Sequence, residues 1–195
     1  FPDRTSVAIN MGFNSDGNPT GDEGARAWVR EIAKTTPVQS WDFSLTEGEN
    51  NVVPHYRLRR LFARRREELA VGAYRGGICF TMSPMLNQLS LYAAAQSFLD
   101  PGADPDTVAR EFFVDIYGPD GGEIVAYLPL FEVIRDWGNY HEIGLPRPQY
   151  HAQVRELADL LHALAPQHPQ ALAMHPPADV YHETLCFYAD LFVEL

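Results

Sequence analysis

The chain has 195 residues, of which 46% are hydrophobic, and its formal net charge at pH 7 is −11. This size suits one domain, or a modest α/β unit with a helical extension, and the composition supports a packed core rather than disorder. The acidic balance argues against nucleic acid as a partner, and no apolar run approaches the roughly 18 residues of a membrane span.

The start of the chain and its cysteines bear on where the protein works. The first residue is Phe1 rather than Met, and no signal peptide is visible. Either processing has removed an N-terminus, or the chain is a piece of a longer polypeptide, which the order of elements favours. Cys79 and Cys186 each lie in an apolar segment, which is more typical of separate buried thiols than of a disulfide. The compartment stays open; a soluble bacterial protein, secreted or periplasmic, is one option.

Three strand–helix units are predicted in the first hundred residues. The strands are expected over residues 6–13, 38–45 and 71–82, and the helices over 23–34, 55–69 and 86–99. The third strand gives the strongest signal, because an apolar run beside Gly76 and Gly77 ends in small polar residues. Such a run is typical of a strand buried on both faces in a parallel sheet.

Two of these helices have an apolar stripe that we expect to face inward. Trp28 belongs to the stripe of the first helix, and Leu58 and Leu69 belong to that of the second. The second helix also carries a run of six arginines between residues 57 and 66. This run could bind an anion, but Glu67 and Glu68 follow it, so a solvated helix face is the favoured interpretation.

The second half of the chain is predicted to be all-helical. Asp104 and Pro105 form a helix start, with the proline at the first helical position and acidic residues at the positive end of the helix dipole. The helices are expected over residues 105–117, 122–137, 149–165 and 178–195.

The predicted fold class is therefore α/β followed by all-α. Residues 1–100 form a βαβαβα segment with parallel strands, and residues 101–195 form a helical domain. Three strands cannot close an eight-stranded barrel, which needs about 250 residues. The strands form either a small open sheet or the last part of a (β/α)8 barrel whose other strands lie upstream, and the abrupt start favours the barrel.

The predicted carboxyl ends of the strands gather residues suited to a sugar. They are Asn10, Trp41, Asp42, Glu47 and Asn87. An aromatic ring stacks on the apolar side of a pyranose, while carboxylates and amides bind its hydroxyl groups. Three of these residues also have a structural interpretation: Trp41 as a packing aromatic, Asn10 as a partner for loop backbone, and Glu47 as a solvated acid. Asp42 is harder to explain in this way, because a buried carboxylate is costly unless it is paired or used.

Several segments resemble the end of a known family of barrels. The chain is similar, over residues 36–120, to the last strands and the junction with a helical domain in hexosaminidase-like and α-glucuronidase-like glycoside hydrolases of bacteria. The resemblance implies that Trp41 and Asp42 line the sugar site and that Asn87 faces it. It also implies that the acid and base carboxylates come from middle strands that this chain lacks. The segments that carry it are residues 38–43, 72–82, 100–106, 111–113 and 117–118.

Catalysis by this chain alone has little support. Glycoside hydrolysis needs two carboxylates that flank the scissile bond, and only Asp42 with Glu47 or Glu49 could supply such a pair here. The sequence has no dinucleotide fingerprint, Walker loop, nucleophile elbow or zinc-ligand spacing. We therefore expect no cofactor and no metal.

Two functions from different classes remain. The first is the carboxyl-terminal part of a glycoside hydrolase that acts on O-glycosidic bonds in a carbohydrate substrate. The alternative is a non-catalytic helical interaction or oligomerisation module, because the second half holds more aromatic side chains than its helices need to bury. An upstream barrel segment or a second copy in a homodimer would cover that surface.

Overall fold

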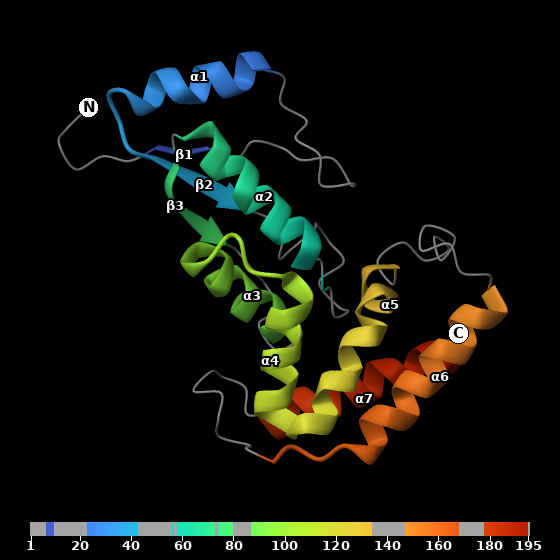
Figure 1. Cartoon of the computed structure of the whole chain (residues 1–195). Helices are drawn as coiled ribbons and strands as arrows, with labels where there is room; N and C mark the ends of the chain where they lie inside the picture. The colour runs from blue at the N-terminus through green and yellow to red at the C-terminus, as the bar shows by residue number, and fades with distance from the viewer. Residues whose placement is uncertain are drawn as a thin grey trace.

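The structure is a computed structural model of the chain, and it describes residues 7–9, 23–42, 56, 58–72, 74–79, 87–133, 147–167 and 178–194. The elements in chain order are β1 (Val7–Ile9), α1 (Glu23–Ala33), β2 (Val38–Asp42), α2 (Leu58–Val71), β3 (Tyr74–Cys79), α3 (Gln88–Leu99), α4 (Pro105–Tyr117), the 3-10 helix η1 (Pro119–Tyr127), α5 (Leu128–Val133), α6 (Arg147–Ala163) and α7 (Ala178–Glu194). Figure 1 shows the three strands beside α1, α2 and α3, with α6 and α7 far from them.

The three strands form a small parallel sheet in the order β1–β2–β3. The central strand β2 pairs Val38 with Val7 of β1 and Asp42 with Cys79 of β3. Parallel neighbours need a crossover connection, and α1 and α2 occupy the two crossovers. Val29 and Val71 from these helices pack with Val38 in a separate small core beside the sheet.

The fold class predicted from the sequence, a partial parallel barrel followed by helices, is wrong, because the described chain is mostly helical. The strands have only three, five and six residues, and β1 and β3 are both edges of the sheet that the described residues form. Apolar runs indicate burial, but they do not determine how many residues pair in a ladder or whether a sheet closes.

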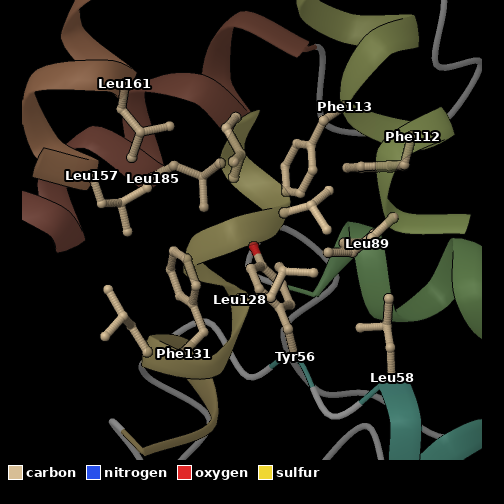
Figure 2. Close-up of a cluster of buried hydrophobic side chains, with 14 of the residues drawn as sticks. Tyr56, Leu58, Leu89, Phe112, Phe113, Leu128, Phe131, Leu157, Leu161 and Leu185 are labelled. Carbon is tan, nitrogen blue, oxygen red and sulfur yellow. The ribbon is translucent and has the colours of Figure 1, made fainter. Parts of the chain in front are cut away.

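The main hydrophobic core lies among the helices. Figure 2 shows side chains from α2, α3, α4, α5, α6 and α7 pointing into one cluster, together with Tyr56. Aromatic rings fill much of it: Phe112 packs edge-on against both Phe113 and Tyr181, at centroid distances of 5.4 and 5.8 Å. Such geometry adds to the stabilisation that burial of the rings provides.

Helix α4 begins where the sequence predicts. The Asp104 side chain accepts hydrogen bonds from the backbone N–H and the hydroxyl of Thr107, both at 2.9 Å, and Pro105 occupies the first helical position. These bonds lower the pKa of the Asp104 carboxyl group, since they stabilise its charged form. The helix ends at Tyr117, and the next residue, Gly118, has a φ of 77°, in the left-handed region that favours glycine.

The segment after α4 differs from the predicted helix over 122–137. It forms η1 and then α5, and η1 approaches α4 very closely: a Cβ atom on Gly121 would lie 2.4 Å from the Phe113 carbonyl oxygen. Only glycine fits at this position, so the packing of η1 on α4 depends on it.

Two predicted helix faces are also corrected. Trp28, expected to face inward, is 57% exposed, and Val29 takes the inward position on α1. On α2, Leu69 is exposed and Glu68 is buried instead. The arginine run is only partly a solvated face, because Arg64 and Arg65 are buried.

Candidate functional site

The carboxyl ends of β2 and β3 lie side by side at the same end of the sheet. Trp41 pairs with Ile78, and Asp42 pairs with Cys79. The backbone of Trp41 and Asp42 is thus held at the end of the central strand, where α/β proteins place ligands. The side chains of these two residues lie outside the described part.

Asn10 and Glu47 both fall outside the described residues, so the structure does not test their predicted roles. The proposed pairing of Asp42 with Glu47 or Glu49 therefore stays a prediction. The domain boundary at residue 100 also stays a prediction.

Asn87 directly precedes helix α3 and is buried at 1% exposure. Its backbone carbonyl accepts a hydrogen bond from the Leu91 N–H at 2.9 Å, but its side chain makes no capping bond to α3. An asparagine at this position usually caps the helix. The Asn87 side chain is therefore a buried polar group whose hydrogen bonding does not involve the start of α3.

Two more polar side chains, Gln88 and Ser90, are buried in the first turn of α3 next to Asn87. Such a concentration of buried polar groups is unusual for a helix start, because each group must be satisfied inside the protein. The sequence analysis named only Asn87. The polar residues Gln88 and Ser90 directly after it were the signal in the sequence that could have indicated the rest of the cluster.

A second cluster, on α2, escaped sequence reasoning. The Arg64 Nε atom donates to Glu68 Oε1 at 3.2 Å, and Arg65 Nη1 donates to Glu68 Oε2. Arg65 is 4% exposed and Glu68 is 2% exposed. The carbon at the centre of the Arg65 guanidinium lies 3.6 Å from the centroid of the Phe98 ring, which is cation–π geometry.

The position of this charged cluster follows from helical spacing. Leu58, Leu61, Phe62, Arg65 and Glu68 recur at intervals of three or four residues, so they share the buried side of α2. The arginine-rich composition hid this pattern. A buried charge needs a partner, and Glu68 serves both guanidinium groups.

A third group of polar side chains joins α4 to α7. The Tyr117 hydroxyl lies 3.2 Å from His182 Nδ1, and the Cys186 sulfur lies 3.6 Å from His182 Nε2. Burial lowers the pKa of His182, and the nearby His162 lowers it further. Burial raises the pKa of the Cys186 thiol to about 11.

The Cys186–His182 pair has the spacing of a nucleophile and its base, but not the electrostatics. A reactive cysteine needs a lowered pKa, because the thiolate is the nucleophile. With a pKa of about 11, Cys186 stays a thiol at neutral pH. It is a free, buried cysteine, as the sequence indicated, whereas the side chain of Cys79 lies outside the described residues.

Across the described part of the chain, no three His, Cys, Asp or Glu side chains gather as a metal site would require. None of the helices described there has the length and apolar character that crossing a membrane demands.

Comparison with known proteins found no match to a family model, to a curated protein sequence or to a solved structure. The resemblance to glycoside-hydrolase barrels therefore stays a prediction from the sequence. The function has to be argued from the residues and their placement.

Proposed function

We propose that this chain is part of a carbohydrate-active protein and binds a saccharide at the carboxyl ends of β2 and β3. Trp41 would stack on the sugar, and Asp42 and Asn87 would bind its hydroxyl groups. The intact protein would hydrolyse an O-glycosidic bond with catalytic carboxylates that lie mainly outside this segment. The proposal requires only that the carboxyl ends of the parallel strands β2 and β3 lie next to each other. It does not require a closed barrel.

One observation carries the proposal: the end of β2, with Trp41 and Asp42, is level with the end of β3. The chain then continues from β3 to Asn87, the buried amide before α3. An aromatic residue, a carboxylate and an amide in successive βα units form a set that suits sugar recognition.

Tryptophan fluorescence gives a direct test, because the chain has three tryptophans, at positions 28, 41 and 137. The double variant Trp28→Phe/Trp137→Phe keeps Trp41 alone. We expect its emission to change saturably with one member of a panel of oligosaccharides and aryl glycosides. The matched control, Trp41→Phe/Trp137→Phe, keeps the exposed Trp28 and should not respond. Silence of both proteins across the panel would remove Trp41 from any sugar site.

Asp42→Asn tests the carboxylate in the same assay. A hydrogen bond to a charged group is worth enough to weaken sugar binding about tenfold when the charge is removed. Asp106→Asn is the matched control, since Asp106 pairs with Arg59 on the exposed surface at 2.8 Å. Equal affinity in the wild type and Asp42→Asn would exclude Asp42 as a ligand of the sugar.

A second candidate, a helical self-association module, has one observation in its favour. Phe187 and Leu191 lie one turn apart on α7, and both are exposed. An exposed apolar patch on a helix is typical of an interface. Light scattering after size-exclusion chromatography would detect a homodimer. Phe187→Glu should then convert it to a monomer, whereas a wild-type monomer would dismiss this candidate.

A further inference from the structure

One side of α7 is exposed along the length of the helix. Each residue on it lies three or four positions from another, so together they share one face. Phe187 is 61% exposed and Leu191 is 37% exposed. We call this face the α7 stripe; its members are two large apolar residues and all the acidic residues of the helix: Phe187, Leu191, Asp179, Glu183, Asp190 and Glu194.

The α7 stripe is acidic as well as apolar. Helix α7 has four acidic residues and no lysine or arginine, and the two arginines of α6, which packs beside it, are balanced by two acids. Asp190 pairs with His162 of α6 at 2.9 Å. Even when His162 is protonated, three of the four negative charges remain, and Glu183 and Glu194 have no ion-pair partner among the described residues. The exposed apolar side chains therefore lie in a negative field.

This field argues against several occupants of the stripe. A two-fold dimer places the same patch of both copies face to face, so that the acids of one stripe would meet those of the other. The same acids repel nucleic acid and the anionic headgroups of a membrane. A partner that covers Phe187 and Leu191 therefore needs apolar side chains flanked by positive charges.

The shape of the stripe favours a helix as that partner. Between Asp179 and Glu194 the axis of α7 rises by about 22 Å, since each helical residue adds about 1.5 Å. A second helix laid along α7 keeps contact over this length, and its own apolar residues at intervals of three or four meet Phe187 and Leu191. Long basic side chains at the border of its apolar face reach the acids on either side.

We propose that the α7 stripe is a docking surface for a basic amphipathic helix of another protein. The apolar side of the partner covers Phe187 and Leu191, and its lysines or arginines pair with Glu183 and Glu194. This role goes beyond the proposed sugar binding, because α7 lies far from the strands of the candidate sugar site (Figure 1).

Fluorescence anisotropy with a labelled synthetic helix tests the proposal. The probe is a peptide of leucine and lysine, about four turns long, with its leucines on one face. We expect saturable binding to the wild-type chain at low salt, and we expect sodium chloride to weaken it. The same peptide with glutamate in place of lysine should not bind.

Phe187→Ala tests the apolar part of the stripe. It should weaken binding of the leucine–lysine peptide about tenfold, because a central aromatic side chain carries much of the energy of an interface. Leu69→Ala is the matched control, since Leu69 is a large apolar residue of α2 that is 52% exposed. Its affinity for the peptide should equal that of the wild type.

The double variant Glu183→Gln/Glu194→Gln tests the acidic part. Two exposed ion pairs would be lost, which should weaken binding about fivefold at low salt. Glu111→Gln/Asp115→Asn is the matched control, because it removes two negative charges from exposed positions on α4 and changes the net charge of the chain equally. This control should bind the peptide like the wild type.

Failure of the wild-type chain to bind the leucine–lysine peptide would overturn the proposal. So would equal weakening in the α7 and α4 charge variants, since the peptide would then follow only the net charge of the chain. A wild-type homodimer that Phe187→Glu separates would also overturn it, because a second copy would then cover the stripe. All the substituted residues are exposed, and circular dichroism checks that each variant is folded. None of these results depends on sugar binding.

Discussion

The hydroxyl groups of Tyr56 and Tyr181 share a hydrogen bond of 2.6 Å inside the main core, although 125 positions separate them in the sequence. Both side chains are fully buried, and burial raises the pKa of each phenol. Tyr56 lies just before α2, and Tyr181 belongs to the first turn of α7. The bond therefore joins the chain after the sheet to one of the last helices described.

Removal of both hydroxyl groups should destabilise the protein by less than the sum of the two single removals. Tyr56→Phe or Tyr181→Phe leaves the partner hydroxyl buried without its bond, which lowers the free energy of unfolding by about 1–3 kcal/mol. The double variant leaves no unpaired hydroxyl, so its loss should be smaller than the sum of the two single losses. Urea denaturation measures all three. Strict additivity would show that the two hydroxyl groups do not interact.

Gly121→Ala should loosen the contact between η1 and α4. The added Cβ would lie 2.4 Å from the Phe113 carbonyl oxygen, a backbone atom that cannot move aside alone. Overpacking of this kind lowers the free energy of unfolding by about 1–3 kcal/mol. Gly102→Ala is the control, because its Cβ would meet only the end of the Asp100 side chain, at 3.2 Å. Equal stability of the two variants would contradict the close approach.

Glu68→Gln should be strongly destabilising. The substitution removes the negative charge that pairs with the buried Arg65 guanidinium, and removal of one member of a buried ion pair costs about 3–5 kcal/mol. Glu67→Gln is a matched control on the same helix, because Glu67 pairs with Arg26 near the surface. Such a pair contributes about 0–1 kcal/mol. Similar losses in the two variants, measured by chemical denaturation, would show that Glu68 is not buried as described.

The stability of the protein should fall as the pH is lowered through the ordinary range of histidine, near 6.5. The pKa of His182 is lowered in the folded protein, first by burial, so the unfolded chain binds a proton that the folded chain does not. Stability therefore rises with pH through this range and is fully present above it.

His182→Gln should flatten that dependence, because glutamine does not titrate. His162→Gln is the control and should keep most of it, since burial is the larger cause of the shift. Melting temperatures measured at several pH values for the three proteins give the comparison. An unchanged slope in His182→Gln would exclude His182 as the titrating group.

Local signals predicted local structure well. Asp104 and Pro105 marked a helix start because an N-cap side chain and a first-turn proline act within a few residues. The order of strands and helices along the first half of the chain also agrees with the elements observed. Local signals could not predict how many residues pair between strands. The barrel that we inferred from three strand–helix units was wrong.

Burial within α2 shows the same limit. The apolar stripe predicted that Leu69 faces inward, and the glutamates after the arginine run predicted that the arginines face solvent, whereas contacts with the neighbouring helix α3 place Arg65 in the interior. Phe98 stacks on Arg65, and Glu68 rather than Leu69 lies in the buried arc. For the candidate sugar site, the sequence supplied Trp41 and Asp42 and the structure supplied their register with β3.

The placement of Tyr181 on α7 has a consequence for how the protein is made. Leu185, Ala189 and Phe192 of the same helix are buried in the main core with it. A ribosome synthesises these residues long after Tyr56 has left the exit tunnel. Water can therefore be excluded from the aromatic side chains of the main core only after α7 has left the ribosome. Until then the nascent chain must keep its earlier helices soluble.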